Sequence, residues 1–216
     1  MKQKIKIINS FKTLVQSVLK FFGYHIEYYY PSGFIKFSQE YYQGKKDLIG
    51  AEIGVYDGEN AANILKHLFV KKLYLIDPYQ NYPEYVESGD SKANQEKLEN
   101  ARNQAFQKLS KFKDKVVWIN EISDTAYKKI PEKLDFVYID ANHNYEFVKK
   151  DIENYYPLIK EGGVLAGHDI EPMWPGVLFA FTDFIREKNL PYRIIEEDWI
   201  IISYPGELYK YFESIK

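Results

Sequence analysis

The sequence of 216 residues contains no cysteine. A chain without thiols cannot form disulfide bonds, zinc ribbons or iron–sulfur clusters, and it cannot use a thiolate nucleophile. Any metal or proton chemistry in this protein therefore depends on carboxylate and imidazole groups.

An excess of charge of one sign is also missing, because 29 Lys and Arg face 31 Asp and Glu, for a net charge of −2. Such a chain has no global basic field, so its composition predicts no nucleic-acid partner. No apolar run reaches the ~20 residues that a membrane span needs. Aromatic side chains, in contrast, make up 17% of the residues, which argues against disorder.

The first 22 residues contain five lysines and no acid, whereas residues 23–216 carry 24 basic and 31 acidic residues, a net −7. Apolar residues recur here at helical spacing: Ile5, Ile8, Phe11, Val15, Leu19 and Phe22. The pattern predicts an amphipathic basic helix. We favour its packing on the chain's own domain or on a second copy, as in a homo-oligomer, and contact with an anionic membrane surface stays open. A signal peptide fits less well, because Gln16 and Lys20 interrupt the apolar run, so we expect a cytoplasmic protein.

From residue 48 onward, short apolar runs alternate with helical patterns. The expected strands are 48–55, 73–76, 116–119, 134–139, 164–166, 192–196 and 199–203. The expected helices are 59–69, 91–113, 123–130, 145–159 and 176–188. This alternation predicts an α/β fold with a doubly wound, mostly parallel seven-stranded sheet of Rossmann-like type. Two residues between the last two strands predict a hairpin and hence an antiparallel final strand. We expect an N-terminal extension in residues 1–45, formed by the amphipathic helix and a connecting segment, and a single α/β domain in residues 46–216.

Sheets of this kind bind ligands outside the carboxyl ends of their strands. The first strand leads into the segment AEIGVYDG, where Glu52, Gly54 and Gly58 surround a tight turn into a helix. This is not the G-x-G-x-x-G pattern of dinucleotide-binding proteins. The second strand ends at Asp77, which is placed to accept hydrogen bonds from ribose hydroxyls. Together the two features favour a nucleoside ligand.

Two acids and two histidines follow the fourth and fifth expected strands. Asp140 and His143 follow the fourth strand, and His168 and Asp169 follow the fifth. Because one helix and one strand separate Asp140 from Asp169, we expect their carboxylates to emerge side by side. The combination suits a hard divalent metal, and it suits acid–base chemistry by a histidine beside a carboxylate equally well.

Three segments together resemble class I S-adenosylmethionine-dependent methyltransferases. They are AEIGVYDG, LYLIDPY and FVYIDANHNYEFVKKDIENYYPLIKEGGVLAGHD. Within that superfamily they are similar to the small-molecule and sugar O-methyltransferase branch that includes the macrocin and mycinamicin enzymes. The resemblance spans roughly residues 48–203.

The resemblance implies S-adenosyl-L-methionine as the cofactor and assigns its contacts. Glu52, Gly54 and Gly58 would surround the methionine moiety, and Asp77 would bind the ribose. Ser123 and Asp124, after the third strand, would read the adenine, and Asp140 would also border the cofactor.

Metal-dependent members of the branch hold Mg with an Asp after strand four and an acidic pair after strand five, and a nearby His acts as base. Asp140, Asp169 and His143 match those positions, whereas His168 stands where those relatives have an acid. We therefore expect Asp140, His168 and Asp169 as the ligand set if Mg or another divalent metal binds, and a metal-free reaction stays open.

These observations predict methylation of a hydroxyl on a sugar, glycan or other small molecule, with His143 as general base and Asp140 and Asp169 orienting it or holding a metal. Two alternatives stay open. One is a Rossmann enzyme that binds NAD or a nucleotide-sugar, and the other is a non-catalytic binding module with the methyltransferase fold.

Overall fold

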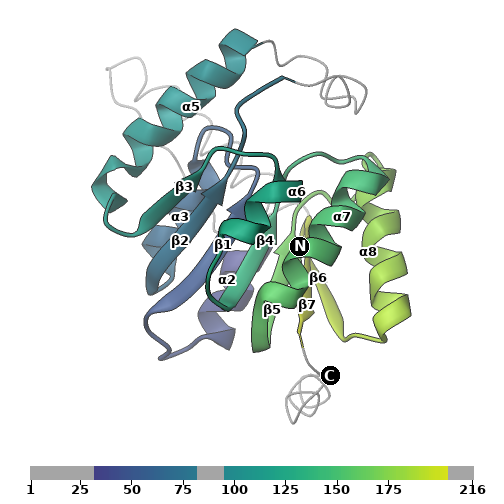
Figure 1. Cartoon of the computed structure of the whole chain (residues 1–216). Helices are drawn as coiled ribbons and strands as arrows, with labels where there is room; N and C mark the ends of the chain where they lie inside the picture. Colours follow the sequence, from purple (N-terminus) through teal and green to yellow (C-terminus); the bar gives the residue numbers. More distant parts are fainter. Residues whose placement is uncertain (1–31, 82–94, 204–216) are drawn as a thin grey trace, which may run out of the picture. The chain divides into compact units, whose positions relative to one another are not determined.

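The computed structural model describes residues 32–81 and 95–203 of the chain (Figure 1). The predicted helix of residues 1–22 lies outside these residues, so its role stays a prediction. Within the described ranges, no helix is both long enough and apolar enough to cross a membrane.

The described residues form a seven-stranded sheet with the strand order β3-β2-β1-β4-β5-β7-β6. The strands are β1 (Leu48–Ile53), β2 (Val70–Ile76), β3 (Val116–Ile119), β4 (Leu134–Ile139), β5 (Ile159–Gly167), β6 (Tyr192–Ile195) and β7 (Asp198–Ile202). The pairs among β1 to β5 are parallel, and β7 is antiparallel to both of its neighbours. The predicted α/β architecture, with its antiparallel final strand, is confirmed.

Helices cover both faces of the sheet (Figure 1). On one face lie α2 (Gly33–Tyr41), α3 (Glu59–His67) and α5 (Gln95–Leu109). On the other lie α6 (Ser123–Ala126), α7 (Tyr145–Tyr155) and α8 (Pro175–Lys188). Three short 3₁₀ turns complete the elements: η1 (Ser110–Phe112), η2 (Tyr127–Lys129) and η3 (Tyr156–Leu158). Because both faces are buried, the central strands are almost continuously apolar, as is usual for parallel sheets.

Helix α2 was not predicted, because its nine residues lie in the segment that the sequence pattern assigns to a connection. Ser32 caps it, since the Ser32 hydroxyl accepts a hydrogen bond from the Ile35 amide at 3.4 Å. Phe34 packs its ring against Phe136 and Tyr138 of β4, with centroids 5.5 and 5.0 Å away. The helix therefore shares the core of the sheet.

The hairpin between β6 and β7 is shifted by one residue from the prediction. The expected link was residues 197–198, whereas the observed link is Glu196 and Glu197, with Glu196 in the left-handed region at φ 59°. Asp198 is instead the first residue of β7 and is 1% exposed. In the sequence, an aspartate beside two glutamates resembles a turn. In the structure, polar groups of three other elements contact the Asp198 carboxylate and compensate for its burial.

Gly54, directly after β1, packs closely against the residue that follows β4. Its backbone has φ 84°, and its amide donates to the Ile76 carbonyl at 2.9 Å. A Cβ at this position would lie 1.8 Å from the Asp140 carbonyl oxygen. Only glycine allows this approach, which brings the first turn of the sheet against Asp140.

We expect Gly54→Ala to destabilise the fold much more than Gly44→Ala. Both glycines have positive φ, 84° and 77°, so each substitution costs about 1 kcal/mol in backbone strain. Nothing lies within 4 Å of a Cβ at Gly44, whereas Gly54→Ala also forces backbone atoms apart, so its total loss should exceed about 3 kcal/mol. Urea unfolding followed by circular dichroism measures both, and equal losses would contradict the close approach.

Candidate active site

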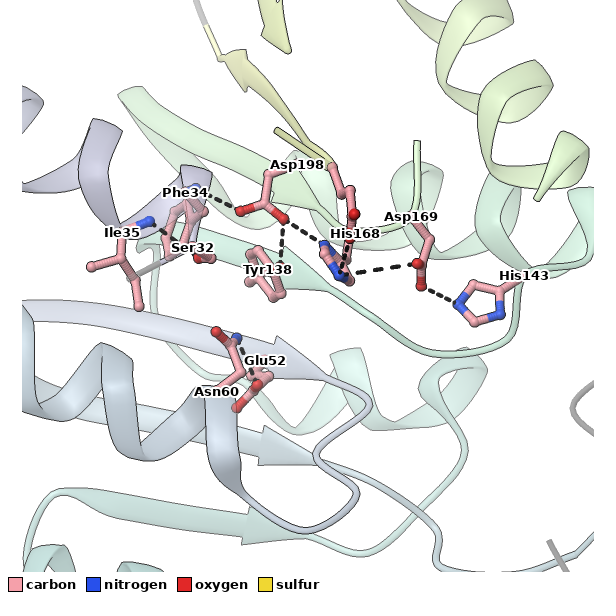
Figure 2. Close-up of polar contacts among 11 residues, drawn as sticks. Ser32, Phe34, Ile35, Glu52, Asn60, Tyr138, His143, His168, Asp169 and Asp198 are labelled. Carbon is pink, nitrogen blue, oxygen red and sulfur yellow. Dashed lines mark hydrogen bonds and ion pairs between the residues drawn. The ribbon is translucent and has the colours of Figure 1, made fainter. Parts of the chain in front are cut away.

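The carboxyl ends of β1, β4 and β5 meet at one edge of the sheet. In the parallel registers, Ile139 of β4 pairs with Ile53 of β1 and with Gly167 of β5. The next residue of β4 is Asp140, and the next two after β5 are His168 and Asp169. The structure therefore brings these predicted site residues together, and Figure 2 shows His168, Asp169 and His143 in a row.

His143 and Asp169 form the central contact of this edge. His143 Nε2 lies 2.8 Å from Asp169 Oδ2, and both side chains are largely buried, at 14% and 19% exposed. Burial alone would raise the pKa of Asp169, but the hydrogen bond from His143 and the charge of His168 hold it below its usual value. Asp169 is therefore ionised at neutral pH and can orient the His143 ring.

The loop that carries His143 is held from two sides. Asn142 is buried, and its side-chain oxygen accepts the Asn144 amide at 2.8 Å. The first turn of α8 approaches so closely that a Cβ on Gly176 would lie 2.2 Å from the His143 carbonyl. The indole of Trp174 packs on the imidazole of His143, with centroids 4.2 Å apart. The ring therefore has a defined place at the rim.

Asp140 has an unusually high proton affinity. Burial raises its pKa to about 6, the charges of His168 and His143 act against this shift, and Asp169 adds to it. The group is mostly ionised at pH 7 and gains a proton just below neutral pH.

His168 differs from His143 in its partner and in its charge. Its Nδ1 lies 2.7 Å from Oδ1 of the buried Asp198. The hydrogen bond to Asp198 raises the pKa of His168 to about 9, although burial opposes the shift. At neutral pH His168 is thus a cation that cannot accept a proton, which leaves His143 as the imidazole suited to act as a base.

Three of the site residues could also supply ligands to a metal ion. One ligand atom from each of Asp140, His143 and Asp169 lies within 4.8 Å of the other two, and two carboxylates with an imidazole suit a divalent ion. His168 lies outside this set, because Asp198 holds its ring. The predicted ligand set with His168 stays a prediction, as does a metal requirement.

Glu52, at the β1 turn, is a buried acid with one unpartnered oxygen. It is 1% exposed, and its Oε1 accepts from the Asn60 amide group at 2.9 Å. For Oε2 no partner is found in the described part of the chain. Burial raises the pKa of Glu52 well above its usual range, and the nearby Asp140 and Asp77 raise it further. A ligand at this turn would meet an oxygen able to bind it.

Asp77 organises the same turn through backbone amides. Its Oδ2 accepts from Val55 and Tyr56 at 3.0 and 2.9 Å, and its Oδ1 accepts from Tyr79 at 2.8 Å. Burial raises the pKa of Asp77, and these three amides offset part of the shift. Tyr79 itself is buried, and its hydroxyl donates to the Tyr56 carbonyl at 2.9 Å. The predicted ribose contact of Asp77 stays a prediction. The structure shows in addition that Asp77 stabilises the turn through these hydrogen bonds.

Ser123 and Asp124 begin α6, after β3, as the sequence pattern predicted. The Tyr155 hydroxyl donates to the Ser123 carbonyl at 3.1 Å, and Asp124 lies 3.4 Å from Lys150 Nζ. Asp151 is fully buried next to Ser123, and burial raises its pKa to about 7. These contacts hold the segment in place, and its predicted adenine contact stays a prediction.

Sequence reasoning missed Trp174, Gly176 and Asp198. Trp174 and Gly176 lie within the segment EPMWPG, which follows His168 and Asp169 closely, so a Trp-Pro-Gly sequence typical of a turn near the predicted ligand edge was an available signal. Asp198 offered no comparable signal, because its partners are distant in sequence.

We expect the His168–Asp198 pair to make stability depend on pH. The folded pKa of about 9 exceeds the ordinary value of 6.5, so the stabilisation is complete below pH 6.5 and is lost as the pH rises through 9. With a side chain 31% exposed, we expect a loss of about 2 kcal/mol. Urea unfolding between pH 6.5 and 9.5, with EDTA present, should show this slope in the wild type and in a His67→Asn control. His168→Asn should flatten it, and an unchanged slope in that variant would contradict the assignment.

Comparison with solved structures identifies the fold. The O-methyltransferase NovP is 18% identical, with a TM-score of 0.57 and coverage of 78% of this chain and 77% of that chain. CalS11, described as a TDP-rhamnose 3′-O-methyltransferase, is 16% identical, with a TM-score of 0.54 and coverage of 80% and 78%. An rRNA methylase from Streptococcus thermophilus is 15% identical, with a TM-score of 0.53 and coverage of 82% and 96%. Identities this low establish a shared fold and leave the acceptor open.

A putative methyltransferase from Streptococcus mutans, solved in complex with SAH, is 16% identical, with a TM-score of 0.56 and coverage of 82% of this chain and 99% of that chain. The uncharacterized protein R132 of Acanthamoeba polyphaga mimivirus is 26% identical over 157 residues, which cover 69% of this chain. That match spans 66% of the mimivirus protein, just under two thirds of its length.

The turn after β1 fits a cationic nucleoside cofactor. Glu52 offers a buried unpartnered oxygen, and the carboxylates of Asp57, Asp77 and Asp140 act on it electrostatically. Negative charge of this kind complements a sulfonium ion. A family model described as a methyltransferase domain matches residues 51–170, more than half of the chain. The chain therefore belongs to the methyltransferase-domain family.

Proposed function

We propose that this protein transfers the methyl group of S-adenosyl-L-methionine to a hydroxyl oxygen of a sugar or other small molecule, with His143 as the general base. The observation that carries the proposal is the 2.8 Å contact between His143 and the ionised Asp169, at the edge of the sheet that also carries residues predicted to bind the cofactor.

His143 can accept a proton at a defined atom. In the tautomer that carries its proton on Nε2, the nitrogen 2.8 Å from Asp169 Oδ2, the neutral ring has its lone pair on Nδ1. Asp169 then stabilises the imidazolium that forms when Nδ1 takes the proton of the acceptor hydroxyl. His168, already protonated, cannot compete for this role.

When bound, the cofactor supplies an electrophilic methyl group on a positively charged sulfur. Transfer from such a centre is an in-line displacement, so placing the acceptor oxygen opposite the sulfur provides much of the rate. The carboxylates of Asp77 and Asp140 would hold the cationic cofactor more strongly than the neutral thioether that remains after transfer. This difference favours release of the product.

The negative charge around the candidate site supports a small acceptor that is either uncharged or cationic. Residues 23–216 carry a net charge of −7, and Glu171 and Glu197 lie beyond Asp169 at the same rim. A hydrogen bond shared with Glu197 raises the pKa of Glu171, which shows how close the two acids are. Such a rim repels the phosphate backbone of RNA. NovP and CalS11 support a hydroxyl acceptor, and the rRNA methylase makes RNA the alternative to test.

We expect S-adenosylhomocysteine to bind the wild-type protein and to bind Asp77→Asn at least tenfold more weakly, because the amide cannot accept all three backbone donors that shape the turn. Isothermal titration calorimetry measures both constants. Asp114→Asn, at an exposed position, is the matched control and should bind like the wild type. Absence of binding to the wild type would overturn the proposed cofactor role of this chain.

We expect His143→Gln to reduce methyl transfer about 10²–10⁴-fold, the usual contribution of a general base, with affinity for S-adenosylhomocysteine within twofold of wild type. The assay uses labelled S-adenosylmethionine with a fractionated metabolite extract and, separately, with total RNA. His67→Gln is the control, and each reaction runs with and without EDTA.

Full activity in His143→Gln would remove His143 as the base. Label in RNA but not in small molecules would overturn the proposed acceptor. Loss of activity on chelation would assign Asp140, His143 and Asp169 to a metal, in which case His143 could not serve as the free base.

A further inference from the structure

Asp198 connects three elements with one buried carboxylate (Figure 2). Its Oδ2 accepts from the Phe34 amide of α2 at 2.6 Å, and its Oδ1 accepts from the Tyr138 hydroxyl of β4 at 2.8 Å. The same Oδ1 lies 2.7 Å from His168 Nδ1, at the end of β5. The residue is 1% exposed, and a carboxylate that is buried to this degree needs compensation by partners.

Two of these partners serve the fold. Helix α2 has no acid in its first turn, so Asp198 supplies the negative charge that the amino end of a helix favours. The Tyr138 hydroxyl would otherwise be buried without a partner. These contacts explain a structural role for Asp198 and no more.

The third partner, His168, connects Asp198 to the candidate active site. The other nitrogen of His168, Nε2, lies 4.0 Å from Asp169 Oδ1 and 3.5 Å from Glu197 Oε2. The second oxygen of Asp169, Oδ2, contacts His143 Nε2 at 2.8 Å. Acid and imidazole thus alternate along the row of Asp198, His168, Asp169 and His143, as Figure 2 shows.

We propose that Asp198 is a positioning residue for His143, acting through His168 and Asp169. The proposal rests on the proposed function in one respect, namely that the His143 ring so oriented is the base of the methyl transfer.

The geometry at Asp169 supports this role. Its backbone lies in the left-handed region at φ 59°, and its carboxylate lies between the two histidines. The carboxylate can rotate about its Cβ–Cγ bond, and a ring on each side favours the orientation in which one oxygen faces His168 and the other faces His143. Asp198 holds the His168 ring in that place. Without the ring there, Asp169 could turn away and His143 could exchange tautomers.

Imidazole NMR tests the proposal without an acceptor. The chain has four histidines, so long-range ¹H–¹⁵N spectra resolve each ring, and His→Gln variants assign them. Full-length protein is measured at one pH, with EDTA and with S-adenosylhomocysteine. The test variants are Asp198→Asn and His168→Asn, and Tyr138→Phe is the matched control.

His168→Asn is the sharper of the two test variants. Its amide can still donate to Asp198 from near the Nδ1 position, so α2 and Tyr138 keep their partner, but the group facing Asp169 is gone. Tyr138→Phe removes a bond to the same Oδ1 and leaves His168 and Asp169 untouched. This pair therefore separates a structural role from a positioning role even if Asp198→Asn fails to fold.

We expect the ring nitrogens of His143 to show one dominant tautomer in the wild type and in Tyr138→Phe. In His168→Asn, and in Asp198→Asn where it folds, they should shift toward an average of both tautomers, and affinity for S-adenosylhomocysteine should stay within twofold. Unchanged His143 signals in folded His168→Asn would overturn the proposal, as would an equal shift in Tyr138→Phe.

Turnover then separates this proposal from the proposed function. If both hold, His168→Asn lowers kcat about tenfold and leaves KM for S-adenosylmethionine unchanged, because the base is misplaced while the cofactor contacts remain. If His143→Gln keeps full activity while the NMR shift is present, the positioning stands and the assignment of His143 as base fails. If kcat in His168→Asn equals the wild-type value although His143→Gln is inactive, the positioning role is overturned.

Discussion

Strand β4 pairs with β1 on one side and with β5 on the other, and Ile139 stands level with both Ile53 and Gly167. Because three parallel strands end at one level, the residues that follow them must share one edge. The close approach of Gly54 to the Asp140 carbonyl secures that level. Without this alignment Asp140, Asp169 and the β1 turn would be unrelated loops, and no site could form.

Gathering so many acids at one edge creates an electrostatic cost, which the structure offsets in three ways. Backbone amides solvate Asp77. A histidine cation balances Asp198 and keeps Asp169 ionised. Raised pKa values let Glu52 and, near neutrality, Asp140 hold a proton. The remaining negative charge would attract a cationic cofactor, so an arrangement that is unfavourable in the free protein would become complementary once the proposed cofactor binds.

Much of the candidate site could be predicted from the sequence, because Glu52 lies in the first apolar run and Asp77, Asp140 and Asp169 follow later runs, which leaves few alternatives in a doubly wound sheet. Helix α2 escaped prediction, since nine residues are too few for a secure periodic signal. The misplaced hairpin had a different cause. Local propensity assigns acidic Asp198 to a turn, whereas pairing of β7 with β5 draws it into the interior, where distant partners neutralise it.

The sequence by itself determined the sheet, the edge that carries the candidate site and the presence of two histidines there, because strand periodicity and strand ends are local properties. Only the tertiary structure decided how the two histidines differ. His168 receives a buried carboxylate from a strand 30 residues further along the chain and becomes a cation, while His143 meets an ionised Asp169 and the Trp174 ring. The charge of an imidazole depends on its neighbours in space, and these neighbours come together only when the chain is folded.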